Sequence, residues 1–443
     1  MGNLEFVNHA CFFYENIDFI FICDPWVEGT AFNDGWNLLD CSTSNKELIS
    51  KLSKNKKDIY IWYSHEHSDH FSISFLKELK GIENEVKIFF QNTFDKRVKK
   101  YLKANKYKIK ELKIGDRFYL DEKHWINLFP WKSGDSFLIM HFDNSNIMNL
   151  NDCITSSKKD SIKIKNYCQI YGIKNIDILF AQFGIANWSG NEFDNNYRKA
   201  EAREKLVRIS NLIKYLNPKN VVLFASYVFF CNDYNFYLNK DQNTPNSVRK
   251  NHCLKKYNNR IFFLKPRDRF KLDSNVSVYL KEKTIEAETH WQNLHKEVKP
   301  IINKNKFYEL FKIRREFKKY QKKIFFNFLG IFSLLEYLGL IKPIKFKIND
   351  LGKIIKLSYI HKLQELKNNE DWDISVSSED LFFSISNDFG FDCLQVNGRY
   401  RTKKYTLNNK LAYFAGPQNM LKNGYGWKRP LNTIQEFLRL ARK

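Results

Sequence analysis

The segment from residue 59 to residue 70, IYIWYSHEHSDH, constrains the fold of this chain more than any other. Its first five residues are β-branched or aromatic, which predicts a short buried strand. Four side chains that can bind a metal follow within six residues: His65, His67, Asp69 and His70. In an extended segment His65 and His67 leave the same face, so their imidazoles can share one ion. The strand therefore delivers a cluster of metal ligands to one point.

The residue types in this cluster predict a site for two metal ions. Asp69 and His70 follow where the chain turns, and they are expected to reach a second ion beside the first. Neutral imidazole and carboxylate suit zinc, iron or manganese, and a pair of such ions can activate water or O2. The alternative is a solvated loop rich in His and Asp, which the apolar strand before it disfavours.

The spacing His-x-His-x-Asp-His after a hydrophobic strand resembles the signature of the metallo-β-lactamase fold. A His-Ala turn at 9–10 and a strand ending in Asp-Pro at 24–25 are similar to the first hairpin of that fold. Further segments resemble the branch that contains the catalytic part of CMP-N-acetylneuraminate hydroxylase: 25–26, 29–36, 149–153, 224–226 and 235–239. The resemblance covers roughly residues 4 to 245, with a weaker match around 373–401.

The order of predicted strands and helices indicates a layered fold. The chain has 443 residues, more than a single core usually holds, and its 43% hydrophobic content is ample for folding. The fold class we expect is α/β (α+β), a four-layer αββα metallo-β-lactamase sandwich with helices outside two sheets. We expect three regions: a catalytic domain over 1–285, a basic helical connection over 286–345 and a C-terminal cap-like α+β region over 346–443.

Residues 304 to 340 differ in character from the rest of the chain. The stretch 304–323 is strongly basic with apolar residues at helical spacing, and 324–340 is mostly apolar. The apolar stretch is shorter than the roughly 20 residues that span a bilayer. Two interpretations stay open. One, which we favour, is a helical connection whose apolar face packs on the main body; the other is weak contact with a membrane surface.

The net charge of +24 suits nucleic acid, an anionic membrane or an acidic protein partner. The lysines are spread along the chain and no recognised nucleic-acid-binding motif accompanies them, so nucleic-acid binding is disfavoured. The eight cysteines are dispersed without a Cys-x-x-Cys pair, and no signal peptide is evident. We therefore expect a reducing, cytoplasmic location.

Two carboxylates outside the cluster are candidate ligands. Asp152 follows a predicted strand and is expected to bridge the two ions, although an Asn-Asp pair is also common in turns. Zinc hydrolases of the resembling fold usually have two further histidines, and the corresponding places here carry none. Asp135 falls near the first place and Asn232 near the second, so Asp135 is a further candidate ligand. His124 and His141 are alternatives that sit within strand-like runs.

The missing histidines favour iron over zinc. Carboxylate-rich dinuclear sites suit iron, whose two ions can bind and reduce O2. The resemblance implies the same chemistry, the hydroxylation of a nucleotide-linked sugar. That family carries a Rieske iron–sulfur module, which needs Cys-x-His and Cys-x-x-His pairs. No Cys in this chain has a His two or three residues downstream. We therefore expect no Rieske cluster and a separate electron donor, such as a ferredoxin.

These inferences predict an iron-dependent oxygenase acting on a nucleotide sugar or a similar small anionic substrate. Asp69 is the expected catalytic residue. Six side chains are expected to contact the substrate: His9, Trp131, Lys132, Trp188, Tyr227 and Asn232. One alternative is a zinc hydrolase of an ester, lactone or phosphodiester, in which Asp69 orients or deprotonates a metal-bound water. The other is a non-catalytic or nucleic-acid-binding protein with a structural metal.

Overall fold

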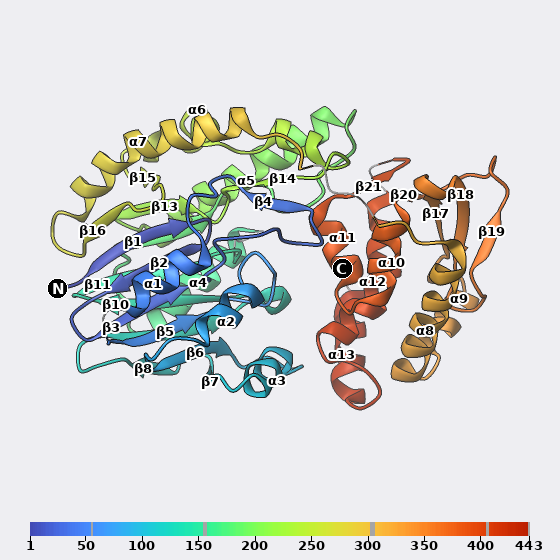
Figure 1. Cartoon of the computed structure of the whole chain (residues 1–443), viewed down its shortest axis with the longest axis horizontal. Helices are drawn as coiled ribbons and strands as arrows, with labels where there is room; N and C mark the ends of the chain where they lie inside the picture. The colour runs from blue at the N-terminus through green and yellow to red at the C-terminus, as the bar shows by residue number, and fades with distance from the viewer. Residues whose placement is uncertain (55, 154–156, 302–305, 405–406, 442–443) are drawn as a thin grey trace.

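Two sheets of seven strands each form the body of the N-terminal region (Figure 1). The computed structural model describes residues 1–54, 56–153, 157–301, 306–404 and 407–441. The first sheet has the order β16 (Arg269–Lys271), β1 (Asn3–Asn8), β2 (Cys11–Glu15), β3 (Phe19–Cys23), β5 (Asp58–Trp62), β6 (Val86–Gln91) and β7 (Lys108–Leu112). The second has the order β15 (Ile261–Phe262), β13 (Asn220–Phe224), β12 (Ile178–Gln182), β11 (Ser145–Asn149), β10 (Ser136–Phe142), β9 (Trp125–Pro130) and β8 (Arg117–Tyr119).

The alternation of side chains along the central strands explains why both faces of the first sheet are covered. Phe21 and Trp62 belong to the core between the two sheets. Ile22 and Ile61, one position away along the same strands, belong to a second core on the outer face. Successive residues of a strand point to opposite faces, so runs that are apolar throughout need a packing partner on each side. The strand at 59–63 is of this kind.

Helices cover the two outer faces and complete the four layers. Three helices supply apolar residues to the outer core of the first sheet: α1 (Asn45–Ser53), α2 (Ile73–Leu79) and α3 (Arg97–Ala104). The helices that pack with the second sheet are α4 (Lys158–Ile170), α5 (Asn195–Leu216), α6 (Pro245–Lys250) and α7 (Val276–Glu297). This αββα sandwich confirms the predicted fold class.

The first region extends beyond the predicted boundary at 285. Helix α7 continues to Glu297, and its Trp291 is fully buried in the core of the sandwich. The Trp291 ring stacks on Tyr227 with 3.7 Å between ring centroids. Residues 286–297 therefore pack with the sandwich, and a change of sequence character does not show where a long helix stops packing.

The remaining residues fold around a core of their own. A five-stranded sheet has the order β19 (Gln364–Leu366), β18 (Lys353–Leu357), β17 (Ile344–Ile348), β20 (Ile374–Val376) and β21 (Tyr400–Thr402). The helices beside it are α8 (Leu310–Phe328), α9 (Ile331–Tyr337), α10 (Ser378–Ser386), α11 (Gly390–Asn397), α12 (Asn408–Lys422) and α13 (Pro430–Ala441).

Helix α8 belongs to this C-terminal core. Its Ile313, Phe317 and Ile324 recur at helical spacing and are buried against the five-stranded sheet and its helices. The stretch predicted as a separate connection is therefore part of the C-terminal region. No helix in the described part of the chain combines the length and hydropathy that a membrane crossing needs.

The two regions are joined beside the loop that leads into β4 (Trp36–Leu38), which pairs with β14 (Val228–Phe230). The Asn397 side chain donates to the carbonyl of Phe32 at 3.1 Å, and Arg399 Nη1 donates to the carbonyl of Asn33 at 2.6 Å. Asn235 Nδ2 donates to the carbonyl of Asn397 at 2.6 Å. These contacts hold α11 against the N-terminal region (Figure 1).

Candidate metal centre

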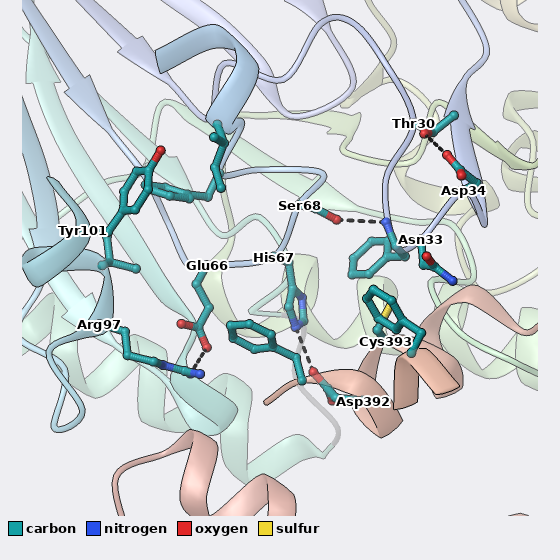
Figure 2. Close-up of a pocket in the computed structure, with 16 residues that line it drawn as sticks. Thr30, Asn33, Asp34, Glu66, His67, Ser68, Arg97, Tyr101, Asp392 and Cys393 are labelled. Atoms are coloured by element: carbon teal, nitrogen blue, oxygen red, sulfur yellow. Dashed lines mark hydrogen bonds and ion pairs between the residues drawn. The ribbon is translucent and has the colours of Figure 1, made fainter. Parts of the chain in front are cut away.

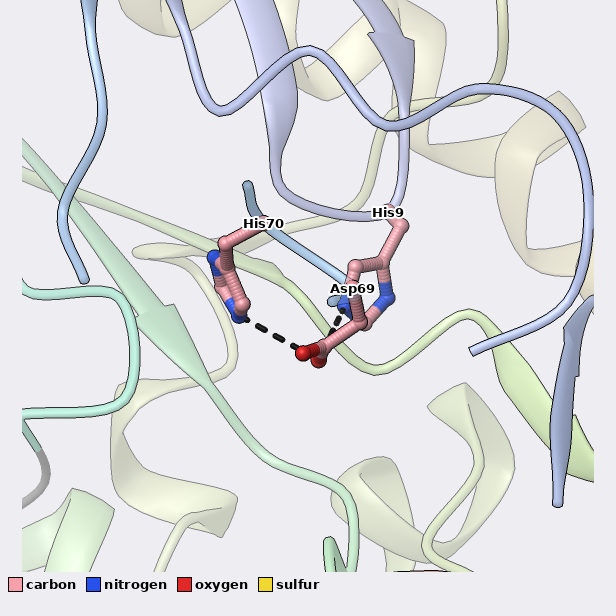
Figure 3. A group of neighbouring side chains, drawn as sticks. All are labelled: His9, Asp69 and His70. Atoms are coloured by element: carbon pink, nitrogen blue, oxygen red, sulfur yellow. Dashed lines mark ion pairs between the residues drawn. The ribbon is translucent and has the colours of Figure 1, made fainter. Parts of the chain in front are cut away.

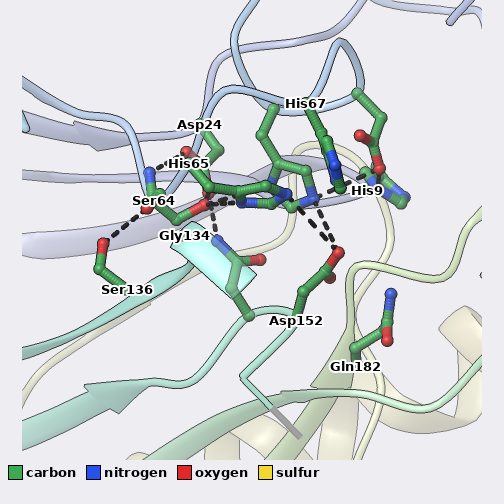
Figure 4. Close-up of polar contacts among 12 residues, drawn as sticks. His9, Asp24, Ser64, His65, His67, Gly134, Ser136, Asp152 and Gln182 are labelled. Carbon is green, nitrogen blue, oxygen red and sulfur yellow. Dashed lines mark hydrogen bonds and ion pairs between the residues drawn. The ribbon is translucent and has the colours of Figure 1, made fainter. Parts of the chain in front are cut away.

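The candidate ligands lie at one edge of the two sheets, in the loops that follow β3, β5 and β11 (Figure 4). β3 and β5 run parallel with Cys23 opposite Trp62, so the segments that follow them leave the first sheet together. β11 of the facing sheet ends shortly before Asp152. Because the sheets face each other, loops from both meet at this edge.

Four of the predicted ligands converge there. His70 Nε2 lies 3.3 Å from Asp69 Oδ2 and 3.6 Å from Asp152 Oδ2. His65 Nε2 lies 3.8 Å from the same oxygen of Asp152. The rings of His65 and His70 are 4.3 Å apart between centroids. Side chains from the two sheets thus share one small volume.

The donor atoms in this volume fit metal ions. Four buried atoms have no hydrogen-bond partner among the described residues: His65 Nε2, His70 Nε2, Asp69 Oδ1 and Asp152 Oδ1. Burying such groups without partners is costly. Ligands about 2.1 Å from one ion lie about 3.0 to 3.4 Å from each other, close to the separations found here. Imidazole nitrogens and carboxylate oxygens that converge without other partners are the set expected of a metal site.

The ionisation of the two central histidines follows from their surroundings. Burial, together with the neighbouring imidazole of His70, holds the pKa of His65 well below its ordinary value. Burial also lowers the pKa of His70, but the carboxylates of Asp69 and Asp152 outweigh it and raise that pKa well above the ordinary value. A metal ion would therefore displace a proton from His70 but meet a neutral His65.

Asp24 orients His70 directly, and His65 through Ser64, by contacts at their Nδ1 atoms. Its Oδ2 lies 3.0 Å from His70 Nδ1 and accepts from Ser64 Oγ at 2.7 Å, while Oδ1 accepts from the Ser64 backbone N–H at 2.8 Å. Ser64 Oγ is in turn 2.9 Å from His65 Nδ1. These contacts place the Nδ1 atoms towards the protein and leave each Nε2 towards the cluster. The sequence analysis noted Asp24 only as the end of a strand.

His9 joins the cluster from the turn between β1 and β2 (Figure 3). It is buried, its φ is +39°, and its Nε2 lies 3.5 Å from Asp69 Oδ2. Neither ring nitrogen has a hydrogen-bond partner among the described residues. His9, Asp69 and His70 form one of three groups whose possible ligand atoms lie within 4.8 Å of one another. His9 was predicted to contact substrate, and the structure places it among the metal-ligand candidates.

The other two groups use the remaining cluster residues. One contains His65, His67 and Asp69, and the other contains His65, His70 and Asp152. The three groups overlap through His65, Asp69 and His70, which fits two ions sharing a ligand shell.

His67 also contacts the C-terminal region. Its Nε2 lies 3.4 Å from Asp392 Oδ2 on α11 (Figure 2). Lys422 Nζ of α12 donates to the same carboxylate oxygen at 2.6 Å. With Nε2 facing Asp392, the nitrogen of His67 left for a metal is Nδ1. Asp392 was missed in the sequence because nothing local connects it to the cluster.

Asp135 lies near the cluster but outside the three ligand groups. Burial raises its pKa to about 7, and the negative charge of Asp152 adds to the shift. Its role as a ligand stays a prediction.

Two further residues near the cluster escaped the sequence analysis. Gln182 ends β12 and accepts a hydrogen bond at 2.5 Å from Lys205 Nζ on α5. Burial lowers the pKa of Lys205 to about 8, with the charge of Asp152 opposing the shift. In the sequence Lys205 reads as one lysine among many on a solvated helix.

Three of the predicted substrate contacts have packing roles in the structure. Tyr227 is fully buried beneath Trp291, and Trp188 stacks on Tyr400 with 5.0 Å between centroids. Asn232 is buried, and its side chain accepts from the backbone of Tyr234 at 3.0 Å. All three side chains are buried, and substrate contact by them stays a prediction.

The remaining candidates are placed as follows. Lys132 Nζ is ion-paired with Asp160 at 2.5 Å, and Trp131 packs beside it on the second sheet's core. Substrate contact by Trp131 and Lys132 stays a prediction. The two alternative histidines bond elsewhere: His124 Nδ1 lies 2.7 Å from Asp121 Oδ2, and His141 Nδ1 lies 2.8 Å from Asn146 Oδ1.

Comparisons with curated proteins point to one group. No family model matches the chain. The inactive cytidine monophosphate-N-acetylneuraminic acid hydroxylase of Homo sapiens is 26% identical over 294 residues, covering 63% of this chain and 55% of that protein. The cytidine monophosphate-N-acetylneuraminic acid hydroxylase of Danio rerio is 26% identical over 262 residues, covering 55% of this chain and 41% of that protein. The chain thus spans about half the length of the curated relatives it matches. The predicted resemblance is confirmed.

Solved structures with a similar arrangement include a protein described as a hydroxylase and one described by its fold alone. CmlA, a diiron β-hydroxylase from Streptomyces venezuelae, covers 61% of this chain and 54% of its own with 13% identity and a TM-score of 0.42. The metallo-β-lactamase fold protein YhfI from Bacillus subtilis covers 61% of this chain and 98% of its own with 10% identity and a TM-score of 0.40.

Proposed function

We propose that the chain is a dinuclear metal-dependent oxygenase. The observation that carries the proposal is the convergence of buried imidazole and carboxylate atoms that have no other partner. The residues proposed to hold two ions are His9, His65, His67, Asp69, His70 and Asp152.

Iron is the metal we favour. Imidazole combined with several carboxylates suits iron, and a pair of iron ions would supply the binding and reduction of O2. The curated relatives are hydroxylases by name, which supports the same reaction class. A substrate of their kind, a nucleotide-linked sugar, stays a prediction for this chain because the match covers only part of those proteins.

The chain's own residues would orient the ligands and hold protons. Asp24 and Ser64 fix the ring orientation of His70 and His65. Lys205 holds a proton at Nζ, hydrogen-bonded to Gln182, on the side of Asp152. Electrons would come from a separate protein such as a ferredoxin, for which the net charge of +24 provides attraction.

Metal analysis of protein purified without oxygen tests the proposal. The wild type should carry about two iron ions per chain, and His65→Ala combined with His67→Ala should lose them. The matched control is His141→Ala, a histidine bonded to Asn146 away from the cluster, which should keep the metal.

The zinc hydrolase is the alternative that the same measurement separates. The hydrolase would be favoured if the wild type carried one or two zinc ions and cleaved esters or phosphodiesters, and if Asp69→Asn lost that activity. Wild-type protein that binds neither metal would contradict both enzymes.

A further inference from the structure

A cavity of about 500 Å³ lies between the metal-ligand loop and the C-terminal region (Figure 2). We call it the interdomain chamber. Its apolar walls come from four separate parts of the chain. They include the apolar and aromatic side chains of Phe32, Phe71, Val98, Tyr101, Phe383 and Phe389. Cavities of this size with mainly apolar walls are typical of small-molecule sites.

The mouth of the chamber exposes large apolar side chains. Ile73 is 45% exposed and Phe389 38% exposed, while Phe32 and Phe71 deeper in the wall are buried. Aromatic rings that line a cavity from several sides can meet a guest ring edge-on or stacked, at centroid distances of about 4.5 to 7 Å. The shape and chemistry of the walls therefore favour an aromatic guest.

The charges in the chamber disfavour an anion. Carboxylates of Asp34, Glu66 and Asp392 line it, and its guanidinium, Arg97, already pairs with Glu66 at 2.7 Å. The Arg97 guanidinium also lies over the Phe389 ring, 4.4 Å from its centroid. Asp392 is likewise paired with Lys422 at 2.6 Å, so both nearby cations already have a carboxylate partner and a phosphate or carboxylate inside would compete with those partners.

His67 connects the chamber to the metal centre. It lines the chamber, and its ring is 4.6 Å from the ring of His65 between centroids. The Phe32 ring meets the His67 ring edge-on at 5.5 Å. A ring held in the chamber would place a substituent beside the cluster.

We propose that the interdomain chamber binds a neutral aromatic group as part of the substrate. The role of the chamber as a substrate site rests on the proposed function. The proposal limits the substrate to molecules whose aromatic part is uncharged. The chamber itself is a property of the fold and can be tested without the metal.

Ligand-detected NMR with small probes tests the chamber. Benzamide supplies a neutral ring, and benzoate is its anionic match. Benzamide should bind at least about five-fold more tightly than benzoate. Equal or tighter binding of benzoate would overturn the proposal.

Variants at the exposed mouth locate the bound probe without threatening the core. Phe389→Ala and Ile73→Ser should each weaken benzamide binding by about five- to ten-fold. Phe193→Ala is the matched control, since Phe193 is 74% exposed and outside the chamber. Unchanged affinity in both mouth variants would refute the chamber as the site.

Metal removal separates this proposal from the proposed function. Benzamide binding that survives chelation and still depends on Phe389 supports the chamber, even if metal analysis rejects a dinuclear centre. Protein that holds two iron ions, but binds benzamide with no dependence on Phe389, rejects the chamber alone.

Discussion

Asp24 orients the histidines of the candidate metal centre without being one of the proposed ligands. It is fully buried and bonds both His70 and the serine that holds His65. Partners behind metal-binding histidines typically contribute 10- to 100-fold to affinity. Asp24→Asn keeps the size but loses the charge, so metal affinity in chelator competition should fall by roughly that factor. Asp268→Asn, a buried carboxylate elsewhere in the fold, should leave metal affinity unchanged.

His295 gives a pH dependence that is independent of the metal. Burial lowers its pKa to about 4 from an ordinary value of 6.5. Between these values the unfolded chain binds more protons, so folding stability falls as the pH drops through that window. In His295→Gln the loss of stability between pH 7 and pH 5 should be smaller by about 2 kcal/mol. Denaturant unfolding of both proteins measures the difference; identical pH slopes would contradict the prediction.

Single residues were predictable where the chemistry was local. His65, His67 and His70 stand within six positions after an apolar strand, so spacing alone brought them together. Asp24 and Asp392 are brought to the cluster by strand pairing and by the contact between the two regions, which no local pattern records.

At the scale of elements, periodicity identified strands and helices but did not show what they pack against. The strands on both sides of the cluster were expected because they are apolar throughout. Helix α8 was also expected from its spacing, but its apolar face completes the C-terminal core and does not cover the sandwich. Amphipathicity shows that a face is buried without naming its partner.

Gly35 is the close contact between the loop before β4 and the end of α11. A Cβ at this position would lie 2.3 Å from the Asn397 Cβ. Gly35→Ala should therefore push the two elements apart and cost about 1 to 3 kcal/mol of unfolding free energy. Gly416→Ala on α12, where a Cβ meets no atom within 4 Å, is the control and should be neutral or stabilising. A stability change no larger than that of the control would contradict the close contact.

At the scale of the whole molecule, the contact between Asp392 and His67 couples the C-terminal region to the metal centre. Asp392→Asn should weaken metal binding by about ten-fold and change the absorption spectrum of cobalt-substituted protein, because the partner of His67 loses its negative charge. Asp392→Glu should restore part of the affinity. Asp388→Asn removes an exposed carboxylate paired with Lys323 in the same region and should do neither.

The end of α8, one face of α9 and the residues just after α9 expose several large apolar side chains. Those at least half exposed are Phe325, Phe326, Leu329, Leu334, Tyr337, Leu338 and Leu340. Lys322 and Lys318 lie one and two turns before Phe326 on the same helix face, and both are exposed. Of the two interpretations of residues 304–340, packing accounts for the buried face of α8 but not for this surface; residues 304 and 305 lie outside the described chain.

This basic and apolar surface predicts binding to an anionic membrane, because apolar side chains enter the interface while lysines meet acidic lipids. Protein should sediment with vesicles containing phosphatidylserine, more weakly at high salt, and not with pure phosphatidylcholine. Leu329→Ser combined with Leu338→Ser should abolish sedimentation. Val278→Ser with Ile285→Ser, equally exposed on α7, is the control. Vesicle binding that is retained in Leu329→Ser/Leu338→Ser would show that this surface does not bind the membrane. A concentration-dependent dimer of the wild type that the same variant abolishes would assign the surface to another copy of the chain.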